Sequence, residues 1–378
     1  MSFSGIRKFF DLVQSMEDVV SLGVGEPDFP TPERIKDAGI RAIENDYTSY
    51  TSNYGLAELR RKISGRLKLK NNFDADPGSE ILVTTGTSEA LDLAMRAIIE
   101  PGDQVIVPQP CYVAYNAVVY FAGGTPVGVD SKEENDFRID PDDIKSKITG
   151  NTKKTKCIVV ASPNNPTGAV LRKGDVEEIA DIAVEYDLVV ISDELYDELV
   201  YDGAKNYSFA ALNGMHERVI TINGFSKNYA MTGWRIGYCA ANADFIEAMM
   251  KIHQYTMLCS PTIAQYAAVR AFEIQETVQE MVKEYDRRRR LLVSGLNSIE
   301  GVECVMPAGA FYAFPNIKSF GMTSEKFCEE LLNKYRVAVV PGSTFGASGA
   351  GYVRCSYAAS TRTIKEAVER IGKFCSEI

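Results

Sequence analysis

The sequence predicts an α/β fold in which helices cover both faces of a sheet, together with a second, smaller α+β domain. Short β-branched and apolar runs alternate with helical patterns through the middle of the chain. These runs are apolar throughout, which is typical of strands buried on both faces. A chain of 378 residues has room for a large core and for two domains.

Seven strands are expected in the larger domain, at residues 81–84, 104–107, 125–129, 157–161, 188–192, 219–222 and 236–239. Helices are expected between them, over residues 88–99 and 173–186. A long polar helix over residues 273–298 then leads to a strand–turn–strand pattern and a last helix over residues 363–374. Residues 45–275 would form the larger domain, and residues 1–44 would join residues 276–378 in the smaller one.

The long helix contains four consecutive arginines, Arg287 to Arg290. Such a block could bind nucleic acid, but Glu280, Glu284 and Asp286 precede it. Acidic residues at this spacing favour a solvated helix with ion pairs between successive turns. The net charge of −10 also argues against nucleic acid or an anionic membrane as the main partner.

Cysteines and histidines are poorly placed for metal or redox chemistry. The eight cysteines lack C-x-x-C spacing, and neither His216 nor His253 is beside one. We therefore expect no metal site, and a proton shuttle built on lysine, tyrosine or a carboxylate. No apolar run could span a membrane, and the N-terminus lacks an apolar signal core. With its cysteines buried in a reducing cytosol, the protein is expected to be cytoplasmic.

Lys227 is the first candidate for chemistry. It lies between the apolar runs at residues 219–222 and 236–239, where a charged lysine needs a ligand or a lowered pKa. With Ser226 before it and Arg235 after it, Lys227 could form a Schiff base to pyridoxal phosphate while its neighbours hold the phosphate. The alternative is an ordinary solvated lysine.

Three polar segments follow predicted strands, where open α/β sheets bind ligands. Residues 86–88, Gly-Thr-Ser, begin a helix and could bind phosphate through free N–H groups, or they could be a simple N-cap. Asn165 lies in a turn-rich loop, and its amide could donate to a phenolate oxygen. Asp193 could pair with a pyridinium nitrogen or cap a helix, and Tyr196 could share the phenolate with Asn165.

Arg354 lies in a run, residues 351–358, that alternates like a strand. An inward-pointing arginine is costly unless it meets an anion, and the planar guanidinium matches a carboxylate. The alternative is a salt bridge to a nearby glutamate.

Together these segments resemble the class I aminotransferases of the pyridoxal-phosphate fold-type I superfamily, over nearly the whole chain. The resemblance rests on three motifs in this order: Asn165-Pro166-Thr167-Gly168, Ser192-Asp193-Glu194, and Ser226-Lys227 followed by Gly233-Trp234-Arg235-Ile236-Gly237. The N-terminal segment and residues 339–343 are most similar to archaeal aromatic and bacterial aspartate aminotransferases. The resemblance implies a mixed, mostly parallel seven-stranded sheet in the large domain. It also implies a homodimer that uses pyridoxal 5'-phosphate to move an amino group from an L-amino acid to 2-oxoglutarate.

The resemblance also implies roles for individual residues. Three would be catalytic: Lys227 through the Schiff base and proton transfer, Asp193 at the ring nitrogen, and Tyr112 stacked on the ring. Asn165 and Tyr196 would hold the ring oxygen. The phosphate would be held by Gly86, Thr87, Ser88, Ser226 and Arg235, with Tyr50 reaching in from the neighbouring subunit. The substrate α-carboxylate would be held by Gly25, Asn165 and Arg354.

Ser88 departs from the pattern. Some bacterial aspartate aminotransferases carry at this position a lysine that meets the distal carboxylate of aspartate. A serine cannot neutralise a buried second carboxylate, so dedicated aspartate specificity is not expected. A set of aromatic residues could instead accept aromatic side chains, or could simply be core: Phe9, Phe10, Tyr112 and Phe311.

Two rival functions remain open. A C–S lyase or related synthase could use the same residues, because the cofactor carries the difficult chemistry. A transcription regulator with an aminotransferase-like domain would need an additional N-terminal DNA-binding domain. Here the aminotransferase pattern begins within the first ten residues.

Overall fold

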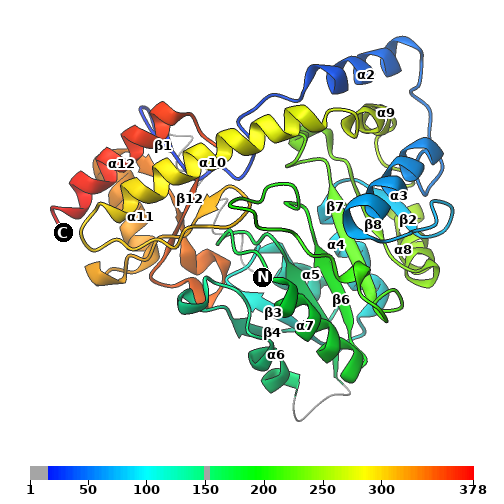
Figure 1. Ribbon diagram of the computed structural model, residues 1–378, viewed down its shortest axis with the longest axis horizontal. Coiled ribbons are helices and arrows are strands. Elements are labelled where there is room, and N and C mark those ends of the chain that lie inside the picture. Colours follow the sequence, from blue (N-terminus) through cyan, green and yellow to red (C-terminus); the bar gives the residue numbers. More distant parts are fainter. Residues whose placement is uncertain (1–15, 149–153) are drawn as a thin grey trace.

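The computed structural model describes residues 16–148 and 154–378 (Figure 1). Its centre is a seven-stranded sheet with the strand order β2-β8-β7-β6-β5-β3-β4. The strands are β2 (Ile81–Thr84), β3 (Gln104–Gln109), β4 (Thr125–Asp130), β5 (Thr155–Ala161), β6 (Val189–Asp193), β7 (Val219–Gly224) and β8 (Gly237–Ala240). Only β8 runs antiparallel to its neighbours. The predicted seven strands and the mixed, mostly parallel sheet are therefore confirmed.

Helices cover both faces of this sheet. One face, which includes Leu82, packs against α4 (Thr87–Ile98), α5 (Ala114–Phe121) and α8 (Ala243–Thr256). The other face, which includes Val83, packs against α3 (Ala57–Asn71), α6 (Pro141–Ile148), α7 (Lys173–Glu185) and α9 (Thr262–Ala271). Successive residues of a strand point to opposite faces of the sheet. Because helices cover both faces, the residues that point to either face must be apolar. This packing explains the continuous apolar runs in the sequence.

A second group of elements surrounds a separate apolar core. It contains α10 (Gln275–Asn297), α11 (Ser324–Tyr335), α12 (Thr361–Cys375), β1 (Val20–Ser21), β9 (Tyr312–Ala313), β10 (Val337–Ala338), β11 (Val340–Pro341) and β12 (Val353–Ser356). The N-terminal segment joins this group because β1 pairs with β10, and the Leu22 carbonyl accepts a hydrogen bond from Ser356 N–H. The sequence pattern did not predict α11. The domain boundaries at residues 44/45 and 275/276 stay a prediction.

The connecting segments complete the fold. Helix α2 (Glu33–Glu44) packs beside α9, away from the second core (Figure 1). Short 3-10 helices span Glu133–Asn135, Phe209–Ala211, Thr232–Trp234, Lys318–Phe320, Gly342–Phe345 and Ala347–Gly349. Within the described residues, no helix combines the length and apolar character needed to cross a membrane.

Only two of the four arginines of α10 are exposed to solvent as predicted. Arg287 and Arg290 are exposed and pair with acidic side chains on their own helix, but Arg288 and Arg289 are buried. Arg288 Nη1 donates to both carboxylate oxygens of Asp28, each at 2.8 Å. Arg289 reaches Asp202, Asp286 and a backbone carbonyl. Both therefore tie the long helix to segments remote in sequence, and the solvated-helix interpretation is wrong for these two residues.

Replacing Arg289 by methionine should therefore lower the free energy of unfolding by about 2–4 kcal/mol, because a carbonyl and two carboxylates lose a buried partner. Arg290→Met is the matched control. Its side chain is half exposed and shares Asp202, so its loss should cost under about 1 kcal/mol. Urea unfolding of both variants measures the difference. Equal losses of unfolding free energy in the two variants would show that the burial of Arg289 adds nothing to the stability of the fold.

Candidate active site

A cavity of about 600 Å³ opens where the parallel strands end and the two groups of elements meet. Ala161 and Asp193 end β5 and β6 at its wall, and Lys227 follows β7. The predicted site residues that line it are Gly25, Thr87, Ser88, Tyr112, Asn165, Asp193, Tyr196, Ser226, Lys227, Arg235 and Arg354. The topology thus brings together segments that lie far apart in sequence, at the edge where such sheets bind ligands.

Lys227 places its amine inside this cavity. Its Nζ donates a hydrogen bond to the Gly25 carbonyl oxygen at 2.6 Å. The pKa of Lys227 is lowered to about 8, chiefly by burial, and the charges of Arg354 and Arg235 add to this effect while Glu26 opposes it. A larger fraction of this amine is therefore neutral near pH 7 than for an exposed lysine. A neutral amine can act as a nucleophile and as a base.

The N-terminus of α4 forms a cradle for an anion. The N-cap residue is Gly86, with φ of +79°, and no side chain caps the helix. The simple N-cap interpretation of residues 86–88 is therefore wrong. A Cβ atom at Gly86 would lie 2.6 Å from the Arg235 guanidinium, so only glycine allows this approach. The helix N-terminus and the guanidinium converge, as phosphate binding requires.

Asp193 presents a buried carboxylate to the cavity. Its Oδ2 accepts a hydrogen bond from the Tyr115 hydroxyl at 2.7 Å, and its Oδ1 accepts one from Leu195 N–H at 3.1 Å. Burial raises the pKa of Asp193, while these two hydrogen bonds and the charge of Lys227 oppose the rise. Sequence reasoning missed Tyr115. Its position one helical turn after Tyr112 was the available signal.

Arg354 is a buried cation without a charged protein partner. It lies on β12, is 3% exposed, and donates to the Asn165 side-chain oxygen at 3.0 Å and to the Gly23 carbonyl at 2.8 Å. Its Nε has no partner, and none of the described carboxylates pairs with it. The salt-bridge alternative is therefore wrong. A Cβ at Gly25 would lie 3.6 Å from this guanidinium, so the glycine leaves space for a ligand carboxylate there.

The aromatic candidates have different positions. Tyr112 and Tyr196 line the cavity, and the Tyr196 hydroxyl shares a 2.9 Å hydrogen bond with that of Tyr312, a lining residue that sequence reasoning missed. Phe311 is fully buried in the second core and does not line the cavity. Its assignment to an aromatic substrate pocket is not supported. Phe9 and Phe10 lie outside the described residues.

Tyr50 is a predicted site residue that does not reach the cavity of its own chain. It lies in the loop between α2 and α3 and is 82% exposed. Glu26 and Thr232, which the sequence did not single out, line the cavity rim and share a 2.9 Å hydrogen bond.

These residues fit pyridoxal 5'-phosphate. The cradle at α4 suits its phosphate, Asp193 suits a pyridinium nitrogen, and the buried amine of Lys227 suits its aldehyde. The guanidinium of Arg354 lines the same cavity without a carboxylate partner among the described residues, which suits the carboxylate of a substrate. The fold and the cavity together define a pyridoxal-phosphate enzyme of fold type I.

Comparisons with known proteins identify the family. Residues 17–371 match the model of aminotransferase class I and II. An aspartate aminotransferase of Pyrococcus abyssi is 49% identical over 377 residues, covering 99% of this chain and 96% of that protein. The aromatic-amino-acid aminotransferase 2 of Thermococcus litoralis is 46% identical over 377 residues, with the same coverage, 99% and 96%. The crystal structure of an aromatic aminotransferase from Pyrococcus horikoshii OT3 matches with a TM-score of 0.93 at 48% identity, covering 98% of this chain and 99% of that one. The chain belongs to aminotransferase class I and II, and it is a pyridoxal-phosphate-dependent transaminase.

Proposed function

We propose that this enzyme moves the amino group of an L-amino acid to 2-oxoglutarate, with Lys227 as the Schiff-base lysine. The observation that carries the proposal is one cavity that holds a buried amine, a buried carboxylate and two separate arginines. A dianionic phosphate and a substrate carboxylate need two cationic positions, and Arg235 and Arg354 supply them. The choice of 2-oxoglutarate as acceptor rests on the family resemblance alone.

When bound, the cofactor supplies an aldehyde for amines and a protonated ring that accepts negative charge from the substrate α-carbon. Lys227 offers its neutral Nζ to that aldehyde. Once displaced by the substrate amine, Lys227 would act as the base that takes the α-proton onto Nζ, and it would then donate this proton back. A pKa of about 8 suits both duties, because the amine is easily deprotonated and still basic.

The remaining residues orient the reacting groups. Asp193 would keep the ring nitrogen protonated, and Tyr115 holds that carboxylate in place through its 2.7 Å hydrogen bond. Asn165 and Tyr196 would hold the ring oxygen, and Tyr112 would stack on the ring. The phosphate would be held by Gly86, Thr87, Ser88, Ser226 and Arg235, and the substrate carboxylate would be held by Gly25, Asn165 and Arg354.

Substrate range follows from the cations in the cavity. Among the described residues that line it, the cations are Lys227, Arg235 and Arg354, and each already has a role. Among the described residues, Ser88 offers no charge to a second carboxylate of the substrate. We therefore assign a broad preference that includes aromatic donors and does not favour aspartate strongly.

Initial rates with tyrosine, phenylalanine and aspartate, each with 2-oxoglutarate, test the activity and this preference. Glutamate should form with all three, with kcat/KM for aspartate comparable to or below the aromatic values. Ser88→Lys should raise the ratio of kcat/KM for aspartate to kcat/KM for phenylalanine by roughly tenfold or more, since a charge-assisted contact is worth about 1.5–3 kcal/mol. Ser88→Met, of similar length and without charge, is the control.

Two results would overturn these assignments. A hundredfold preference of the wild-type enzyme for aspartate would place another cation at the distal carboxylate. Ammonia and pyruvate formed without any amino acceptor would instead favour the C–S lyase alternative, because a lyase eliminates its product and needs no keto-acid acceptor.

A homodimer accounts for Tyr50 and for the apolar surface around it. Ile40 and Ile43 on α2, and Tyr255 and Met257 before α9, are exposed in the single chain. These segments adjoin one another, because α2 packs on α9 and the loop that holds Tyr50 is bonded to the start of α9. Exposed apolar surface of this kind marks an interface. Across it, Tyr50 would reach the phosphate bound by the partner.

Mixing inactive variants tests the crossing of Tyr50. Tyr50→Phe protomers are mixed with Lys227→Ala protomers under conditions of subunit exchange. In a heterodimer one site then carries both lesions and the other carries none, so activity should return to about half per heterodimer, by two-fold symmetry. If an impaired Tyr50 variant shows no recovery, then Tyr50 acts in its own subunit.

The proposed compartment is the cytoplasm. All eight cysteines are free, and all except Cys259 are buried. Burial also raises the thiol pKa of several of them, for example that of Cys111 to about 12, so these thiols are unreactive. Free, buried thiols suit a reducing compartment.

A further inference from the structure

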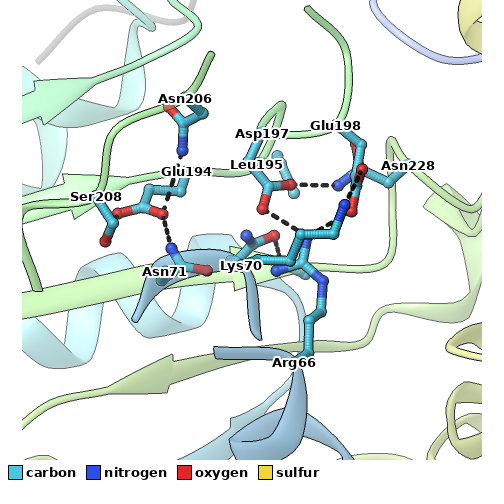
Figure 2. A network of polar contacts seen from close by, with 12 residues as sticks. Arg66, Lys70, Asn71, Glu194, Leu195, Asp197, Glu198, Asn206, Ser208 and Asn228 are labelled. Carbon is cyan, nitrogen blue, oxygen red and sulfur yellow. Dashed lines mark hydrogen bonds and ion pairs between the residues drawn. The ribbon is translucent and has the colours of Figure 1, made fainter. Parts of the chain in front are cut away.

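A largely buried polar network surrounds Glu194 and Asp197, which adjoin cavity residues in the sequence (Figure 2). Most of its members come from α3, from the segment that follows β6 and from the turn after β7, and Asn206, Ser208 and Gln275 join them. None of them is used in the transamination chemistry above. The side chains of Arg66, Asp197 and Glu198 are almost completely buried, and buried charges are costly unless they are paired.

The network connects to the lysine turn at one point. Asn228, the residue after Lys227, is 0% exposed, and its Nδ2 donates a hydrogen bond to Asp197 Oδ1 at 2.7 Å. The other carboxylate oxygen of Asp197 accepts from Arg66 of α3 at 2.5 Å. Arg66, Asp197 and Asn228 therefore form a continuous relay from a helix on the sheet to the turn of the catalytic lysine (Figure 2).

The same segment after β6 carries residues of the cavity. Asp193, Leu195 and Tyr196 line the cavity, whereas Glu194 and Asp197 face the network. Glu194 accepts hydrogen bonds from Asn71 at 2.6 Å and from Ser208 at 2.7 Å. The network thus contacts both segments that carry the reacting groups, through residues that do not line the cavity.

Resting on the function proposed above, we propose that the Arg66–Asp197–Asn228 relay positions Lys227 for proton transfer. A lysine side chain is long and flexible, so the location of its amine depends on how firmly its backbone turn is held. Proton transfer requires the amine within hydrogen-bond reach of the α-carbon, and small displacements are costly in rate. Asn228 fixes the turn through one buried hydrogen bond, and Arg66 fixes the acceptor of that bond.

Glu198 provides a matched control within the same cluster. It also pairs with Arg66, at 3.2 Å, and accepts hydrogen bonds from Lys70 and Gln275. Among the described contacts it has none with residues 226–228, the turn of the lysine. Glu198→Gln keeps the shape of the side chain and removes its charge. It therefore perturbs the cluster and its stability without touching the bond to Asn228.

Two variants break the relay: Asn228→Ala removes the donor, and Asp197→Asn keeps the shape but weakens both links. Steady-state kinetics should show kcat reduced about ten- to a hundredfold, with KM changed by less than about threefold. A second readout needs no turnover. Acetylation of Lys227 by acetic anhydride in the full-length, cofactor-free chain, followed by peptide mass spectrometry across pH, gives the pKa of this amine.

In both relay variants the midpoint of Lys227 acetylation should rise by about half a pH unit or more, because a loosened amine gains access to water and loses the effect of burial. Glu198→Gln should keep both the midpoint and kcat within twofold of the wild type. If Glu198→Gln changes the midpoint and kcat as much as the relay variants do, or if the relay variants change neither, then the network only stabilises the fold. If Asn228→Ala fails to fold, the isosteric Asp197→Asn decides. A wild-type enzyme without transaminase activity would refute the proposed function, and the acetylation midpoints would still test the relay.

Discussion

The burial of one amine between opposing charges is the constraint on which the rest of this structure depends. Lys227 lies near two carboxylates, Glu26 and Asp193, and two guanidinium groups, in a cavity lined on one side by the N-terminal segment whose Gly25 carbonyl accepts its hydrogen bond. Burial makes the amine a weaker base, and the charges around it make the cavity a site for anions. An amine with a lowered pKa and anion-binding groups on two sides suits the amine exchange on a phosphate-bearing aldehyde proposed above.

The groups that surround Lys227 come from several segments that lie far apart in the sequence. Strands β5, β6 and β7 end at the same edge of the sheet, so the residues that follow them meet in space. Gly86 allows Arg235 to approach the start of α4, and β12 of the second core contributes Arg354. Each half of the molecule thus supplies one of the two anion-binding cations. The polar network around Glu194 and Asp197 contacts two of the contributing segments through residues that do not line the cavity.

Sequence patterns predicted the sheet and most of the residues that line the cavity, because both depend on short local segments. The roles of these residues remain predictions. The buried strands are continuous apolar runs, and the cavity residues lie in short motifs directly after those strands. The buried state of Arg288 and Arg289 could not be predicted in this way, because it depends on Asp28 and Asp202, far away in the chain. Helix α11, which lies between the long helix and the last helix, was not predicted, and Tyr115 had no motif of its own. Tyr50 and the domain boundaries remain predictions.

Covalent labelling of the wild-type holoenzyme tests the central claim most directly. Borohydride reduction fixes the cofactor to the lysine that binds it, and peptide mass spectrometry then identifies that residue. The account predicts one modified lysine, Lys227, because its Nζ is the buried amine with a pKa near 8 in the cavity. Modification of a different lysine, or a cofactor that is bound without any reducible link to the protein, would contradict it.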